Sequence, residues 1–196
     1  MTKRQLQGAE SREQILDIAE GLMAERGVTG TSISALTKAS GLPASSIYWH
    51  FGSKDGVLVA VMERGSERFF VSLAPPESFK GTGAERIRAQ LDDTAEAITE
   101  HGDFLGLLLT LILVHHESTD EASTVIARVR AEARSRVDRM LIAADGGSPR
   151  RRRHPLTGIV LAAIDGIFIA HLEDPEGVDF RASFRQLGRM VEASLT

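Results

Sequence analysis

The chain has 196 residues and a formal net charge of -4 at pH 7, with 42% hydrophobic and 26% charged residues. These proportions are typical of a water-soluble globular protein and exclude fibrous and largely disordered chains. The absence of cysteine excludes disulfides, thiol nucleophiles and thiolate metal sites. The negative net charge provides no general attraction to nucleic acid.

The first ten residues are polar and lack the apolar stretch of a secretory signal. The longest apolar runs are residues 104–114 and 159–172. The first is too short to cross a bilayer, and Asp165 interrupts the second. We therefore expect a cytoplasmic protein with no membrane partner, in which both runs form buried helices.

Apolar residues recur at helical spacing and strand-like alternation is missing, so the sequence predicts an all-α fold. Ser11 and Gln14 have the spacing of a capping box, which predicts that the first helix begins at Ser11. Gly27 is its predicted end. Its predicted apolar face consists of Ile15, Ile18, Ala19, Leu22 and Met23.

Thr31 or Ser32 is the predicted cap of a short second helix, which Gly41 ends because glycine tolerates a left-handed turn. A third helix is predicted over residues 43–50. Ser53 is the predicted N-cap of a fourth, whose apolar face contains Val57, Leu58, Val61 and Met62.

Residues 73–83 are rich in proline and glycine, which predicts a connection between two modules. The spacing beyond it predicts five further helices, over residues 84–100, 104–115, 121–144, 156–172 and 180–195.

The second and third helices, joined by a tight glycine turn, have the layout of a DNA-binding helix-turn-helix. The first turn of the third helix contains Ala44, Ser45 and Ser46. Small side chains allow a helix to enter the major groove, and serine hydroxyls can bind base edges or phosphates. These residues are therefore candidate DNA contacts.

The only tryptophan and the only tyrosine of the chain are neighbours in this same short helix, as Tyr48 and Trp49, followed by His50. An aromatic core is the alternative interpretation of such a cluster. Because these residues lie beside polar side chains and outside the long apolar helices, DNA contact is the better interpretation. Ile47 and Phe51 are assigned to the core of the module.

The segment from Ser46 to Asp55 resembles the hallmark segment of the TetR family of bacterial transcriptional regulators, and residues 31–36 match the second helix of that family. The resemblance covers about residues 11–64. It departs from the family at Pro43, where a small capping residue is common. The resemblance implies an Ω-shaped, all-helical homodimer that binds double-stranded DNA through its N-terminal modules and a small molecule in its C-terminal bodies.

The resemblance also assigns roles to individual residues. It implies that Tyr48 and His50 contact the DNA backbone, and that Lys54 with the N-terminal amides of the fourth helix holds a phosphate. Ser32 and Ser34, in the second helix, are further candidate DNA contacts.

We therefore expect an N-terminal three-helix helix-turn-helix module at residues 1–55 and a helical effector-binding and dimerisation domain at residues 56–196. The expected function is repression at a near-palindromic operator, relieved by a small, mainly hydrophobic effector. No nucleophile–base pair, phosphate loop or metal motif has usable spacing, so neither enzyme activity nor a cofactor is expected. An activator and a helical protein-interaction module are the alternatives.

The effector region is predicted around residues 104–114, which are apolar on nearly every face and should form a central helix opposite residues 91–98. Solid core is the alternative interpretation of the same residues. Thr94, Thr110 and His115 are the predicted polar anchors. The candidate residues are Leu91, Thr94, Ile98, Phe104, Leu108, Leu111, His115, Val129, Ile164 and Phe168.

The last two predicted helices are too apolar for the surface of a monomer, and the resemblance implies that they form a four-helix bundle between two subunits. A helix pair buried within one chain is the alternative. The candidate interface residues are Ala162, Ala163, Gly166, Ala170, Phe184, Leu187 and Val191.

Two charged motifs have less specific interpretations. His115-His116-Glu117 contains metal-binding residue types, but neighbours on a helix point about 100 degrees apart, so a polar cap or helix end is favoured over a metal site. The four arginines at residues 150–153 follow a Gly-Gly-Ser-Pro sequence. A solvated loop is favoured over a nucleic-acid patch for these arginines.

Overall fold

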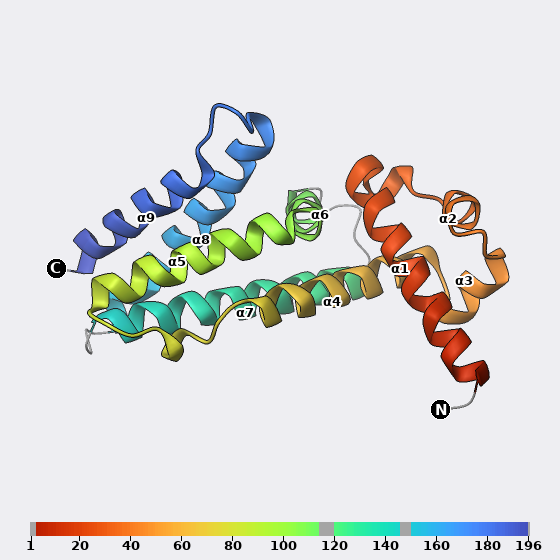
Figure 1. Cartoon of the computed structure of the whole chain (residues 1–196), viewed down its shortest axis with the longest axis horizontal. Helices are drawn as coiled ribbons and strands as arrows, with labels where there is room; N and C mark the ends of the chain where they lie inside the picture. The colour runs from red at the N-terminus through yellow and green to blue at the C-terminus, as the bar shows by residue number, and fades with distance from the viewer. Residues whose placement is uncertain (1–2, 114–119, 146–149, 196) are drawn as a thin grey trace. The chain divides into compact units, whose positions relative to one another are not determined.

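The computed structural model describes residues 3–113, 120–145 and 150–195 (Figure 1). Within these ranges the chain forms α-helices and one short 3-10 helix and contains no strand, which confirms the all-α prediction. The helices are α1 (Lys3–Gly30), α2 (Ile33–Ser40), α3 (Ala44–Phe51), α4 (Lys54–Ser72), η1 (Pro76–Ser78), α5 (Gly83–Glu100), α6 (Gly102–Leu113), α7 (Asp120–Asp145), α8 (Arg150–Glu173) and α9 (Phe180–Leu195).

The helices pack into two compact units. The first contains Met1–Arg68 and His101–Ala127, and the second contains Phe69–Glu100 and Arg128–Thr196. The helices α4 and α7 therefore contribute residues to both units. The first unit is larger than the predicted N-terminal module because α6 packs against α1. The packing of α6 on α1 was not predicted from the sequence.

The first helix begins earlier than its sequence predicts. The predicted capping box at Ser11 is wrong, because α1 begins at Lys3 and the Ser11 hydroxyl donates a hydrogen bond of 2.8 Å to the Gln7 carbonyl one turn earlier. A serine can satisfy its hydroxyl in this way inside a helix. The Gln14 amide instead donates to the Ser40 carbonyl at the end of α2, at 3.0 Å. Gly27 breaks the helical geometry, as predicted, with φ 71° and ψ 171°.

The core of the first unit brings together apolar residues of α1, α2, α3, α4 and α6. The predicted apolar face of α4 is buried, and so is Ile47 of α3. Phe104 of α6 lies so close to Gly65 of α4 that a Cβ atom at position 65 would be 2.4 Å from a ring carbon. The fully buried side chains of this core include Ile15, Leu16, Met23, Leu36, Ile47, Val57, Met62 and Phe104.

In the second unit α9 packs against α5 and α8, and the three helices lie side by side (Figure 1). The assignment of Phe184, Leu187 and Val191 to a dimer interface is wrong, because all three are buried within the single chain. The apolar stripe that they form on α9 is buried by packing inside this unit. Helical periodicity indicates that a face is buried, but it does not indicate whether the partner is the same chain or another.

The outer face of α8 is exposed in the single chain, so the apolar run at residues 159–172, which was predicted to form a buried helix, is buried only on its inner side. Ile159 is 63% exposed, and Ala162, Gly166 and Ile169 follow it at helical spacing on the same exposed face. Within the described ranges one helical stretch, Pro155–Glu173, is long and apolar enough to cross a membrane by length and composition alone, and 22% of its apolar segment is buried.

The arginine run belongs to a helix. The prediction of a loop at residues 150–153 is wrong, because the backbone is helical there and α8 begins at Arg150. Arginine is among the better helix-forming residues, so these positions extend the helix N-terminal to Pro155.

Asp165 interrupts the apolar sequence of α8 because it has a dedicated partner. Its two carboxylate oxygens accept hydrogen bonds of 3.0 and 2.8 Å from the Arg130 guanidinium of α7. Bidentate pairs of this kind fix orientation as well as adding energy. The pair therefore sets the register of α8 on α7 inside the second unit.

Candidate nucleic-acid interface

The second helix and the following turn have the predicted caps. The Ser32 hydroxyl oxygen accepts a 3.1 Å hydrogen bond from the Ala35 amide, which satisfies one free N–H at the start of α2. Gly41 adopts φ 70°, and its N–H donates to the Thr37 carbonyl at 3.0 Å. This left-handed glycine ends α2 and allows α3 to start after Pro43.

Helix α3 divides its side chains between core and solvent. Ile47 is fully buried, whereas Tyr48 is 52% and Trp49 is 77% exposed. Ser45 is exposed as well, and Ala44 and Ser46 are half-buried. A short helix anchored by one aliphatic residue, with its large aromatic residues facing water, is well suited to contact a partner. Aromatic side chains of this size usually bury much of their surface in a core or an interface.

The N-terminal extension of α1 contributes to the surroundings of Trp49. A Cβ atom at Gly8 would lie 3.9 Å from the indole, so α1 approaches the face of α3 here. The Trp49 ring also contacts His50 edge-on, with centroids 4.5 Å apart. The largely exposed indole is therefore approached by α1 and by the His50 ring.

His50 is half-buried near a guanidinium group. Burial lowers the pKa of His50, and the positive charge of Arg12 lowers it further. The neutral imidazole is therefore favoured at neutral pH, and its N–H remains a hydrogen-bond donor. Arg12 also lies over the Phe51 ring, 5.5 Å from its centroid.

Lys54 has an intramolecular partner in addition to its predicted role. Its ammonium group donates a 2.8 Å hydrogen bond to the Val28 carbonyl, beyond the break in α1. The predicted cap of α4 is present, because the Ser53 hydroxyl accepts a hydrogen bond from Gly56 N at 2.9 Å. Lys54 thus fastens the start of α4 to the end of α1, and its phosphate contact stays a prediction.

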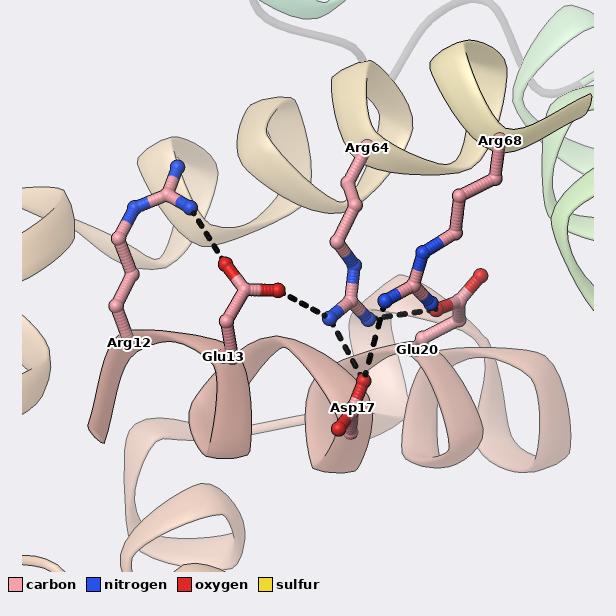
Figure 2. A network of polar contacts seen from close by, with 6 residues as sticks. All are labelled: Arg12, Glu13, Asp17, Glu20, Arg64 and Arg68. Atoms are coloured by element: carbon pink, nitrogen blue, oxygen red, sulfur yellow. Dashed lines mark hydrogen bonds and ion pairs between the residues drawn. The ribbon is translucent and has the colours of Figure 1, made fainter. Parts of the chain in front are cut away.

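Helices α1 and α4 are joined by a network of ion pairs (Figure 2). Arg64 of α4 binds three carboxylates of α1, at 3.2 Å to Glu13, 2.7 Å to Asp17 and 2.7 Å to Glu20. Burial disfavours the charged guanidinium, but its hydrogen bonds to the carboxylates outweigh burial and raise the pKa of Arg64. Arg68 lies 3.9 Å from both Asp17 and Glu20.

Three polar features of this unit were not among the predicted site residues. Lys38 is an exposed cation on the last turn of α2, and the helical pattern alone did not separate it from other surface lysines. Arg12 and Arg64 act through partners on other helices, so only the folded chain brings them together. Ser32 and Ser34 are both exposed at the start of α2, where they were predicted to contact DNA.

The predicted effector residues fall in both units, and the effector region stays a prediction. Most of these residues are buried in the core of the unit to which they belong. Phe104, Leu108 and Leu111 are buried in the first unit, and Leu91, Ile98, Val129 and Phe168 are buried in the second, where Ile164 is half-buried.

The predicted polar anchors have different outcomes. The Thr94 hydroxyl donates to Gln90 in its own helix, and the Thr110 hydroxyl donates to Gly106. His115 lies outside the described residues, as does the motif at residues 115–117.

Comparison with known sequences places the helix-turn-helix in a family. Residues 15–61 match the family described as "Bacterial regulatory proteins, tetR family". The chain is 33% identical over 100 residues to the transcriptional repressor NemR of Escherichia coli K12, a match that covers 50% of each chain. It is 39% identical over 62 residues to the regulator AcrR of Shigella flexneri, covering 32% of this chain and 28% of that one. The match to NemR spans half the length of that relative.

Solved structures share the fold over nearly the whole chain. A TetR-family regulator from Agrobacterium tumefaciens has a TM-score of 0.73 at 17% identity, with 95% of this chain and 98% of that chain covered. A putative regulator from Saccharomonospora viridis, solved in complex with choline, has a TM-score of 0.77 at 17% identity, covering 94% and 96%. These relatives are named as regulators and not as enzymes. The helix-turn-helix segment at residues 15–61 is therefore similar in sequence to that of TetR-family regulators, and the chain shares the all-helical fold of solved members of that family.

Proposed function

We propose that the protein is a cytoplasmic repressor that binds a near-palindromic operator as a homodimer and leaves it when a small molecule binds. The observation that carries DNA binding is the surface of α3, with buried Ile47 on one side and exposed Tyr48 and Trp49 on the other. In a symmetric dimer, two such helices would enter successive major grooves about 34 Å apart. The names of NemR as a repressor and AcrR as a regulator support this role.

The experiment that tests this function is selection of genomic DNA fragments by the purified protein, followed by mobility shift at several salt concentrations. Phosphate contacts make operator affinity fall as salt rises. Salt-sensitive binding to specific fragments is the expected result. Binding that does not distinguish these fragments from random DNA of equal length would contradict the proposal. An activator would bind equally well, so a reporter gene behind the selected operator decides between repression and activation.

Removal of the Tyr48 hydroxyl tests one contact directly. Tyr48→Phe keeps the exposed ring but loses one donor, so operator affinity should fall about fivefold, the usual value of a single hydrogen bond. The slope of log affinity against log salt should stay unchanged, because no cation is lost. Thr110→Val, which removes an exposed hydroxyl from α6, is the matched control. Equal affinity of Tyr48→Phe and wild type would exclude a contact of this hydroxyl with DNA.

The exposed face of α8 supports dimerisation. Ile159, Ala162, Gly166 and Ile169 form an apolar surface whose small residues permit close approach of another helix. Ala163 and Ala170 border it as half-buried residues. We infer that two subunits meet on this face.

Charge on this face should separate the subunits. Ile159→Glu would place a carboxylate in the proposed interface, where burial of an unpaired charge is costly. Analytical ultracentrifugation should then show a monomer, whereas wild type sediments as a dimer. Val71→Glu is the control, because Val71 is 78% exposed at the end of α4. A dimer formed by Ile159→Glu would contradict the proposed interface.

Effector control rests on the family and on the apolar character of α6. Choline, the ligand of the Saccharomonospora viridis relative, is one probe, and a set of small hydrophobic compounds is the other. An effector must bind the DNA-free conformation more tightly than the DNA-bound one, since equal binding shifts no equilibrium. Release of the selected operator fragment by one of these compounds is the expected result.

A further inference from the structure

A continuous line of side-chain contacts connects the end of the recognition helix α3 to α4. Arg12 lies over the ring of Phe51, the last residue of α3, and its Nη1 atom is 3.2 Å from Oε1 of Glu13. The other carboxylate oxygen of Glu13 is 3.2 Å from Nη1 of Arg64 (Figure 2). Glu13 therefore binds one guanidinium with each of its oxygens.

The two guanidinium groups differ in how firmly they are held. The Arg64 side chain is only 10% exposed and is fixed by Asp17 and Glu20 as well as by Glu13. Arg12 is 43% exposed, and its ion pair with a described residue is the one to Glu13. Glu13 is thus the link through which the fixed Arg64 restrains the more exposed Arg12.

We propose that Glu13 is a positioning residue for DNA binding, because it holds Arg12 against the last turn of α3 while Arg64 holds Glu13 in place. The inference rests on the proposed function, since it assumes that α3 reads DNA. Tyr48, Trp49 and His50 occupy this last turn, so a displaced Arg12 would alter the surface that they present. The charge of Arg12 already acts on this turn, because it contributes to the lowered pKa of His50.

Simple electrostatics and positioning predict opposite results for Glu13→Gln. A carboxylate near DNA repels phosphates, so its removal should strengthen binding if charge alone matters. If Glu13 positions Arg12, its removal should weaken binding instead. If Glu13 only contributed to folding, Glu13→Gln would not weaken operator binding by the folded protein. The direction of the change in affinity therefore distinguishes the explanations.

The experiment measures the affinity of the full-length protein for the selected operator fragment at several salt concentrations, together with thermal melting. We expect Glu13→Gln to bind about fivefold more weakly than wild type, as is usual for residues coupled in one network. Glu10→Gln is the matched control, because Glu10 is exposed on the same helix and joins none of the ion pairs between described residues. It should bind equally well or more tightly. Glu13→Asp keeps the charge but has a shorter side chain, so it should also bind the operator more weakly than wild type. It replaces Glu13→Gln in the test if Glu13→Gln has a lowered melting temperature.

Arg12 variants complete the test. Arg12→Gln should weaken binding without changing the salt slope, and Arg12→Gln with Glu13→Gln should bind no more weakly than Arg12→Gln alone. A salt slope smaller by about one would mean that Arg12 contacts a phosphate itself and would overturn the proposal. If wild type binds the fragment and Glu13→Gln binds it as tightly or more tightly, the positioning role of Glu13 is overturned but the proposed function is not. Failure of wild type to bind any fragment overturns the proposed function.

Discussion

Gly56→Ala should weaken operator binding more than tenfold, although it adds a single methyl group. Gly56 lies in the first turn of α4, and a Cβ atom there would be 1.9 Å from the carbonyl oxygen of Phe51 and 3.0 Å from its carbonyl carbon. Backbone atoms cannot rotate away as a side chain can, so the end of α3 must shift. The proposed DNA-binding surface includes the same turn of α3, so operator affinity should fall more than tenfold. The expected loss of stability is about 1–3 kcal/mol or more, the usual cost of overpacking.

Gly21→Ala is the matched control for Gly56→Ala. Gly21 is an exposed residue of α1, and no described atom outside its own helix lies within 4 Å of the Cβ that alanine would add. Alanine favours the helix there by about 0.5–1 kcal/mol, so Gly21→Ala should melt at the same or a slightly higher temperature. Mobility shift and thermal melting measure both variants. Wild-type operator affinity in Gly56→Ala would show that the turn between α3 and α4 tolerates the displacement.

Phe104→Ala should cause the largest loss of stability of any single truncation in the first unit. Phe104 is 1% exposed and lies against Gly65 of α4. Truncation of a buried phenylalanine to alanine typically costs about 3–5 kcal/mol, from lost burial and from the cavity left behind. The free energy of unfolding of a typical domain is about 5–15 kcal/mol, so the helix-turn-helix unit would be close to unfolding at working temperature. Denaturant titration followed by circular dichroism measures the difference.

A second substitution separates core packing from a role in effector binding. Gly65→Ala should destabilise wild type, because the new methyl group would lie 2.4 Å from the Phe104 ring. In the Phe104→Ala background the ring is gone, so the same methyl group should be neutral or should restore some stability. A residue that mainly lines an effector cavity would instead show little loss of stability on truncation. An unchanged denaturation midpoint in Phe104→Ala would therefore favour the predicted effector role over the core.

Local chemistry explains which elements could be predicted from sequence. The cap of α2 at Ser32, its end at Gly41 and the cap of α4 at Ser53 each depend on residues within four positions, and all three are present in the structure. Ser11 has the same cap chemistry but is inside α1. A serine hydroxyl can satisfy itself in the preceding turn, so the capping pattern does not by itself fix where a helix begins.

Features that depend on distant residues could not be predicted in this way. Arg64 binds carboxylates 44 to 51 positions away, and one guanidinium among many gives no sign of its partners before folding. The stripe on α9 was correctly interpreted as a buried face, but its partner is α5 of the same chain. The exposed stripe on α8 is apolar as well, and the sequence did not show which of the two stripes is covered within the chain.

The exposed indole on α3 has a practical consequence for spectroscopy. Trp49 is the only tryptophan of the chain, so fluorescence excited at the indole band reports on helix α3 and its surroundings. Because Trp49 is 77% exposed, the emission of the free protein should be that of a hydrated indole. Contact with DNA would remove water from the ring and shift the emission to shorter wavelength or quench it. The protein can therefore serve as an unlabelled reporter of its own binding.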